Sequence, residues 1–146
     1  MEIQKTQKSH RSIFKNISEM KNAVGKELGL TPWSIMDQER INIFAKATQD
    51  EQWIHLDEER CKKESPYKQT IAHGFLMLSM CSKIMYDSYE VEQVSMAINY
   101  GLDRVRFPHA TPAGSKFRGR VYLVEFDMIP KGAKYKFNVI IELEGQ

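Results

Sequence analysis

The sequence predicts a single α+β domain in which a set of helices is followed by a run of strands. Two patterns lead to this prediction. Apolar residues recur at helical spacing in several segments before Tyr89, and they alternate with polar residues near the C-terminus, as in a strand. The chain has 146 residues, a length that fits one domain able to bury its own core. One buried helix covered by a curling antiparallel sheet satisfies both patterns.

The first part of the chain is predicted to be only partly ordered. Residues 1–15 are rich in Lys, Gln, Ser and Thr, so we expect a flexible lead-in, with the domain spanning residues 16–146. A short amphipathic helix is predicted over residues 18–28, and Gly29 would end it. This helix rests on three apolar residues spaced four apart: Met20, Val24 and Leu28.

Two further helices are predicted before residue 65. Residues 33–36 indicate a short strand or an extended segment, and Asp37 then offers a side chain that can cap a helix. The apolar face of that helix consists of Ile41, Phe44, Ala45 and Thr48. A second short helix is expected over residues 57–64.

The longest elements follow. The most apolar helix is predicted over residues 70–86, and apolar side chains around most of its circumference indicate burial on most sides. Strands are then expected over residues 94–102, with 104–107 as a continuation, and over residues 117–128. A turn at residues 130–132 precedes a half-buried strand with strictly alternating apolar residues: Tyr135, Phe137, Val139, Ile141 and Leu143.

Composition argues against several classes of protein. The formal net charge is +2 and the basic residues have acidic neighbours, which gives no case for a nucleic-acid partner. The longest apolar stretch, residues 71–80, is too short to span a bilayer, and we expect no membrane segment and no secretory signal. Cys61 and Cys81 show neither metal-ligand spacing nor a disulfide pattern. We therefore expect no metal, no cofactor and a cytoplasmic location.

Asp50 and His55 are the first candidates for chemistry, because a carboxylate and an imidazole move protons near neutral pH. Their spacing is unfavourable in regular structure. Five residues along a helix leave two side chains about 140° apart, and five along a strand place them on opposite faces. They converge only if a helix ends near Asp50 and the chain bends before His55. Spacing alone favours a surface aspartate and a loop histidine.

Gly74 is the second candidate, because it lies near the start of the most apolar helix. N–H groups at a helix start have no partner within the helix, and a glycine there lets a ligand oxygen approach the backbone, as in an oxyanion site. The alternative is that Gly74 only allows tight packing of the helix against the sheet. The neighbouring His73 either faces a ligand or, as the residues favour, is a buried histidine with its hydrogen bonds satisfied.

Arg104 and Arg106 are the third candidates. They lie on a strand-like segment, residues 98–108, where they could hold a phosphate or a carboxylate. The sequence alone favours two solvated cations at the edge of a sheet.

Taken together, these segments resemble the MaoC-like dehydratases, a family of (R)-specific enoyl-CoA hydratases, and most closely its nodulation protein N-like branch. The similarity runs from about Ser18 to the end of the chain. The matching stretches are Phe44-Ala45-x-Ala47-Thr48-x-Asp50-x-Gln52-Trp53-Ile54-His55-x-Asp57, then Thr70-Ile71-Ala72-His73-Gly74-Phe75-Leu76, then Asn99-Tyr100-Gly101-Leu102 and Val105-Arg106-Phe107-Pro108. Their order and intervals make the resemblance specific.

The resemblance implies a hot-dog fold, in which an antiparallel sheet wraps one long central helix, here residues 70–86. It also implies a homodimer, or a higher homo-oligomer, with an acyl tunnel near the interface and a substrate carried by coenzyme A or acyl carrier protein. The implied reaction is the reversible addition of water to a trans-2-enoyl thioester, which gives the (R)-3-hydroxyacyl product.

The family's catalytic aspartate and histidine match Asp50 and His55, and its backbone oxyanion donor matches Gly74. Further residues of the site region are expected to contact substrate: Trp53, Ile71, His73, Phe75, Asn99, Tyr100 and Arg106. Two other functions remain open at this point. One is a non-catalytic module that binds acyl thioesters, and the other is a thioesterase on the same fold.

Overall fold

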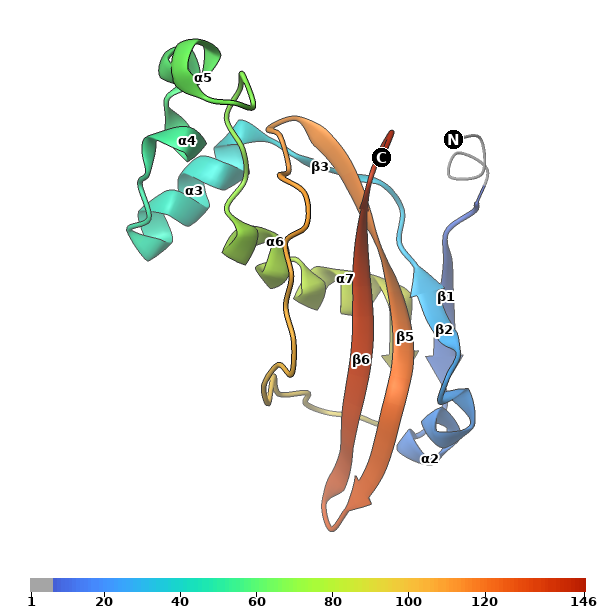
Figure 1. The fold of residues 1–146 in the computed structure, drawn as a ribbon. Coiled ribbons are helices and arrows are strands. Elements are labelled where there is room, and N and C mark those ends of the chain that lie inside the picture. The colour runs from blue at the N-terminus through green and yellow to red at the C-terminus, as the bar shows by residue number, and fades with distance from the viewer. Residues whose placement is uncertain (1–6) are drawn as a thin grey trace.

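A six-stranded sheet curves past a rod formed by two consecutive helices, α6 and α7 (Figure 1). Three further helices, α3, α4 and α5, lie together at one end of the molecule. The computed structural model describes residues 7–146. In chain order the elements are β1 (His10–Phe14), α2 (Ile17–Met20), the 3₁₀ helix η1 (Lys21–Ala23), β2 (Glu27–Leu30), β3 (Ser34–Met36), α3 (Gln38–Thr48), α4 (Trp53–Leu56), α5 (Glu58–Glu64), α6 (Gly74–Ser79), α7 (Cys81–Ser88), β4 (Tyr89–Val91), β5 (Ser115–Ile129) and β6 (Gly132–Leu143). The predicted α+β class is confirmed.

Strand β5 organises the sheet. It pairs with β6 along one edge through a tight hairpin and with β2 and β3 along the other, always antiparallel. Strand β1 extends the sheet from β2, and β4 pairs with β1 in parallel. A purely antiparallel sheet was expected, but the sheet is mixed at this end. The chain enters β4 directly from α7 and runs in the same direction as β1, so these two strands pair in parallel.

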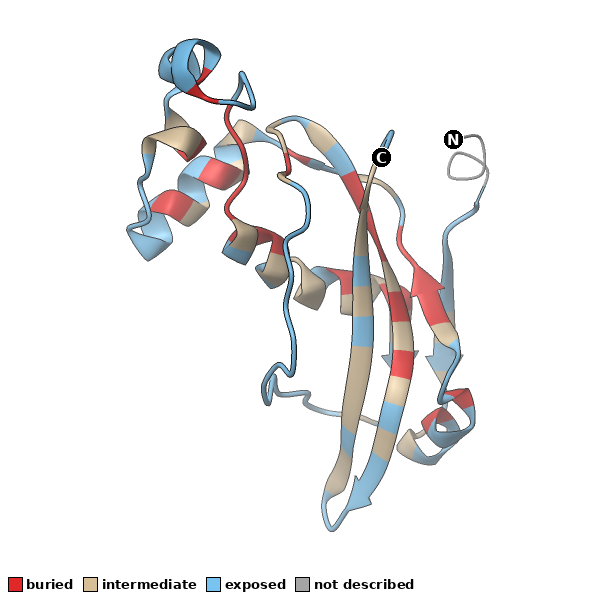
Figure 2. Ribbon diagram, viewed as in Figure 1, coloured by how far each residue is buried: buried red, intermediate tan, exposed pale blue. Residues whose placement is uncertain are grey.

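The rod formed by α6 and α7 lies close to the sheet because two glycines remove side chains at the contact. A Cβ added at Gly119 would lie 2.3 Å from the Ile84 side chain, and one added at Gly29 would lie 2.4 Å from the Ser88 carbonyl oxygen. Buried residues concentrate where β2 and β5 face this rod (Figure 2). These glycines thus set the distance between the two layers of the core.

Several predicted elements are confirmed. The side chain of Asp37 accepts a hydrogen bond from the Arg40 N–H and caps α3, and Asp57 caps α5 in the same way. Strands β3, β5 and β6 are found where expected. The alternating residues of β6 pack against the core as predicted: Tyr135, Phe137, Val139, Ile141 and Leu143.

The N-terminal predictions need correction. A flexible lead-in was expected over residues 1–15, but residues 10–14 form β1 and are held by two neighbouring strands; residues 1–6 lie outside the described residues. The helix expected over residues 18–28 ends at Ala23, because Gly25 adopts a left-handed conformation and turns the chain. Gly29, expected to end that helix, lies within β2.

The central helix begins later than predicted. Residues 70–73 are extended, since the Ala72 N–H donates to the Thr111 carbonyl and the Ala113 N–H donates to the Thr70 carbonyl. The helix then starts at Gly74 and runs as α6 and α7, with Met80 at the junction. An extended segment therefore delivers His73 and Gly74 to the end of the rod.

The strands predicted over residues 94–102 and 104–107 are absent from the described chain. Strand pairing needs a neighbouring backbone, and between residues 7 and 146 no segment makes backbone hydrogen bonds with residues 95–110. The apolar residues that suggested a strand are instead exposed: Met96, Ile98, Tyr100 and Leu102.

None of the helices in residues 7–146 combines the length and the apolar character needed to cross a membrane.

Candidate active site

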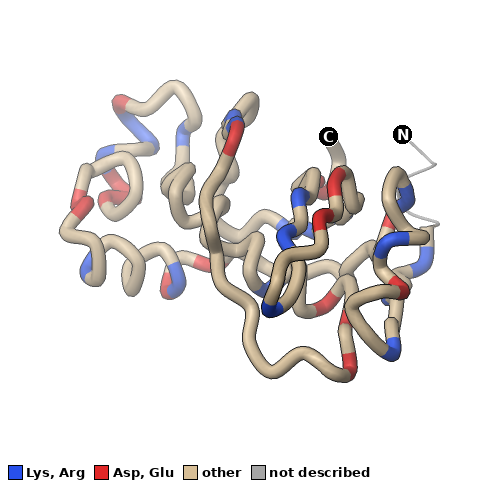
Figure 3. Tube along the Cα trace, turned by 90° about the horizontal axis from the view of Figure 1, so that it is seen from below, with Lys and Arg blue, Asp and Glu red and all other residues tan. Residues whose placement is uncertain are grey.

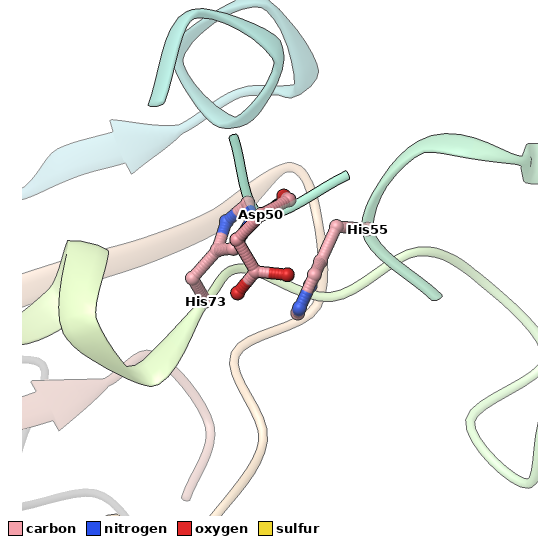
Figure 4. Close-up of side chains that lie close together, drawn as sticks. All are labelled: Asp50, His55 and His73. Carbon is pink, nitrogen blue, oxygen red and sulfur yellow. The ribbon is translucent and has the colours of Figure 1, made fainter. Parts of the chain in front are cut away.

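Asp50 and His55 converge because the chain bends between them, as their spacing required. Helix α3 ends at Thr48, and Gln49 follows in a left-handed conformation with φ of 63°. A new helix, α4, begins at Trp53 and carries His55. Figure 4 shows the Asp50 carboxylate directed toward the imidazole of His55, with His73 beside both. A side-chain nitrogen or oxygen from each of the three lies within 4.8 Å of the others.

The tautomer of His55 follows from its hydrogen bond. Nδ1 lies 2.7 Å from the carbonyl oxygen of Ile71. A carbonyl only accepts, so Nδ1 carries the proton and Nε2 keeps its lone pair. The side chain is buried, whereas Asp50 is exposed. His55 therefore presents a proton acceptor beside a solvent-accessible carboxylate.

The surroundings of His55 keep it neutral. Burial lowers the pKa of its imidazole below the ordinary 6.5; the bond to the Ile71 carbonyl opposes this, while His73 lowers the pKa further and Asp50 raises it. The net direction is downward. At neutral pH the ring is thus unprotonated and can accept a proton from a water molecule.

His73 lies against both members of the pair and is only 2% exposed. Its Nε2 lies 2.9 Å from the backbone oxygen of Asp50, so Nε2–H donates to that carbonyl. Its ring stacks on His55 with 3.7 Å between centroids and packs at a tilt against Phe44. Nδ1 is buried and has no hydrogen-bond partner within residues 7–146. The expectation of a satisfied buried histidine therefore holds for one ring nitrogen and fails for the other.

Gly74 is the first residue of α6, directly after His73. Its N–H accordingly has no acceptor within the helix. A Cβ at this position would lie 2.8 Å from the ring of Phe107, so the glycine allows that ring to approach. Both sequence-based interpretations of Gly74 thus fit its position: an unpaired backbone donor and close packing.

Comparison with known proteins identifies the family to which the chain belongs. The sequence model of the MaoC like domain matches residues 19–142. The chain belongs to the MaoC-like domain family. Two relatives are similar in sequence to this MaoC-like chain over most of its length. The 3-hydroxyacyl-thioester dehydratase Z of Mycobacterium tuberculosis (strain ATCC 25618 / H37Rv) is 38% identical over 133 residues, which cover 90% of this chain and 87% of that protein. Nodulation protein N of Rhizobium leguminosarum bv. viciae is 39% identical over 135 residues, covering 90% and 83%.

Solved structures agree on the fold. A monoamine oxidase regulatory protein from Archaeoglobus superposes with a TM-score of 0.71 at 22% identity, over 90% of this chain and 86% of that one. The (R)-hydratase from A. caviae superposes with a TM-score of 0.59 at 17% identity, over 78% and 81%. The hot-dog fold and the MaoC-like resemblance expected from the sequence are therefore confirmed.

The other predicted site residues of this MaoC-like chain differ in their burial and in their contacts. Ile71 is buried and supplies its carbonyl to His55. Trp53 opens α4, with the Arg60 guanidinium 4.2 Å from the centre of its ring. Phe75 is exposed on α6, edge-on to Phe107.

Asn99, Tyr100 and Arg106 are exposed on the segment between β4 and β5, which forms no regular structure at these residues. Tyr100 lies beside Lys134 of β6. A contact of these three residues with substrate stays a prediction.

Two contributors were not singled out from the sequence. Phe107 packs over Gly74, and it belongs to the stretch 105–108 that carries the family resemblance. Gln38 donates from Nε2 to the His55 carbonyl over 2.7 Å, and its Oε1 accepts from the Thr70 hydroxyl. Only its place one residue after the Asp37 cap could have drawn attention to it.

The Asp50–His55–His73 cluster contains the residue types that bind transition metals. Its geometry argues against a shared ion. The two imidazoles stack with only 25° between their planes, whereas a ligand nitrogen binds a metal in the plane of its ring. One ion cannot lie in both of these nearly parallel planes. His55 Nδ1 and His73 Nε2 are also both committed to carbonyl oxygens. This geometry suits proton transfer better than metal binding.

Proposed function

We propose that this protein is a hydro-lyase that adds water reversibly to a trans-2-enoyl thioester and forms the (R)-3-hydroxyacyl thioester. The observation that carries the proposal is the convergence of Asp50 with an uncharged His55 whose Nε2 lone pair is free. Family membership and a dehydratase relative that acts on 3-hydroxyacyl thioesters support the same reaction.

Each group has a chemical task in this reaction. A water molecule between Asp50 and His55 loses a proton to the pair as its oxygen attacks the β-carbon. The thioester oxygen gains negative charge as an enolate forms, and the Gly74 N–H, which has no acceptor within α6, stabilises it. A proton then passes from the pair to the α-carbon. Because two close groups titrate together, the transfers belong to the pair as a unit.

The proposed partner is a second copy of the chain. Residues 93–102 carry no charge and run through the structure as an extended segment (Figure 3). No strand in residues 7–146 pairs with this segment through backbone hydrogen bonds. Apolar side chains on this segment are exposed, including Met96, Ile98 and Leu102. Large exposed apolar patches mark protein interfaces, and unpaired backbone favours pairing with another chain. A homodimer would cover this segment and bring Asn99 and Tyr100 into a shared interface.

The acyl group is proposed to arrive on coenzyme A or acyl carrier protein. We place the acyl tunnel at the dimer interface, as the family resemblance implies. A surface hollow of about 400 Å³ in the single chain is lined by Gln38 and Thr70 and not by Asp50, His55 or Gly74. Both cysteines are free thiols, which agrees with the reducing cytoplasm as the proposed compartment.

The direct test is a set of trans-2-enoyl-CoA substrates of increasing chain length. We expect the absorbance of the conjugated thioester to fall and chiral analysis of the product to give the (R)-3-hydroxyacyl-CoA. Release of free thiol would instead identify a thioesterase. Thermal stabilisation by acyl-CoA without turnover would identify a binding module. Either result would contradict the proposal.

A further inference from the structure

One buried side chain contacts both members of the Asp50–His55 pair. We infer that His73 is a positioning residue that holds Asp50 and His55 in their convergent arrangement; the inference rests on the proposed hydration. It assigns to His73 a task different from the substrate contact expected from the sequence.

Asp50 depends strongly on this contact. It follows the turn at Gln49 and precedes α4, so no regular element holds it. Its N–H lies 3.4 Å from the Thr48 hydroxyl, a long hydrogen bond. Its carbonyl accepts from His73 Nε2 over 2.9 Å, which is an ordinary distance. The stronger of these two backbone bonds therefore comes from His73.

His55 is held by several groups at once. Its Nδ1 donates to the Ile71 carbonyl, its own carbonyl accepts from Gln38, and its ring stacks on His73. Losing the stack removes one of three restraints. The position of Asp50, rather than that of His55, should thus respond most to a change at residue 73.

A neutral donor is sufficient for this task. His73 uses Nε2–H, while its buried Nδ1 has no partner within the described residues. The amide nitrogen of glutamine reaches about as far from the backbone as Nε2 of histidine, whereas that of asparagine reaches only as far as Nδ1. Glutamine should therefore replace His73, and asparagine or phenylalanine should not.

The experiment compares three variants in the enoyl-CoA hydration assay: His73→Gln, His73→Asn and His73→Phe. We expect kcat to fall by about 10- to 100-fold in His73→Asn and His73→Phe, because a small displacement of a reacting group costs rates of this order. KM should stay within about threefold, since substrate binding is unchanged. His73→Gln should keep kcat within about fivefold of the wild type. A merely structural role would not reproduce this rescue.

Crystal structures of the wild type, His73→Gln and His73→Phe give a readout that needs no turnover. We expect Asp50 to keep its place relative to His55 in the first two and to move in the third. An unmoved Asp50 in His73→Phe, wild-type kcat in that variant, or equal losses in His73→Gln and His73→Phe would each overturn the inference. If the wild type shows no hydration, the proposed function fails, while these structures still decide the positioning role.

Discussion

At the scale of single residues, the site depends on how two imidazoles are protonated. His55 and His73 each donate one N–H to a backbone carbonyl, of Ile71 and Asp50 respectively. These bonds fix complementary tautomers, so that His55 keeps Nε2 available for the proposed reaction while His73 commits Nε2 to the backbone. Backbone carbonyls thus determine which nitrogen performs which task.

The pH dependence of kcat/KM tests this state of His55. Burial lowers the pKa of its imidazole below the ordinary 6.5, and the neutral form is the proton acceptor. Activity should therefore fall as the pH drops through the lowered pKa, giving an acid limb with its midpoint below 6.5. Glu51→Gln, which changes an exposed neighbouring carboxylate, should leave the limb in place. A midpoint at or above pH 6.5 would show that the acid limb does not report a lowered pKa of His55.

Sequence reasoning reached some of these residues and not others. Asp50, His55 and Gly74 carry reactive groups or a backbone signature, and their order matched a family pattern. The contributions of Gln38 and Phe107 depend on contacts between distant parts of the chain. Ile71 acts through its carbonyl, a group that every residue has. Periodicity and residue type contain no information about such contacts.

At the scale of elements, the site lies where an extended segment meets the start of the helical rod. Residues 70–73 hydrogen-bond to residues near 111–113, which fixes the position of Gly74. The apolar pattern predicted a helix from residue 70, because apolar side chains in an extended buried segment look the same as those of a buried helix. The tertiary bonds to Thr111 and Ala113 decide between the two.

The contact of the rod with the sheet gives a prediction at this scale. A Cβ at Gly29 would lie 2.4 Å from the carbonyl oxygen of Ser88, and backbone cannot move aside as a side chain can. We expect Gly29→Ala to lower the free energy of unfolding by about 1–3 kcal/mol or more. Urea denaturation measures this. A free energy of unfolding equal to that of the wild type would refute the close packing of Gly29 against Ser88.

At the scale of the whole molecule, the extended segment 93–102 is the part that one chain leaves incomplete. A strand was predicted over residues 94–102, and the prediction was wrong for the single chain because no strand in residues 7–146 pairs with this segment through backbone hydrogen bonds. A second copy could supply the missing partner. The apolar residues of segment 93–102 would then form part of the dimer interface.

Matched aspartate substitutions test the proposed dimer. Ile98 is 75% exposed on this segment, and Ile43 is 61% exposed on α3. In sedimentation experiments we expect the wild type and Ile43→Asp to be dimers. Ile98→Asp should dissociate at least about tenfold more readily, since a charge buried at an interface is costly. A monomeric wild type, or dimers of equal strength in both variants, would contradict this interface.

The central claim is that Asp50 and His55 act together on a water molecule. Its most direct test is the rate of enoyl-CoA hydration by Asp50→Asn compared with Glu51→Gln, two variants that each remove one exposed carboxylate. Loss of a positioned acid–base group costs about 10²–10⁴-fold. We predict a loss in this range for Asp50→Asn, with an unchanged melting temperature, and a wild-type rate for Glu51→Gln. A wild-type rate in Asp50→Asn would contradict the account.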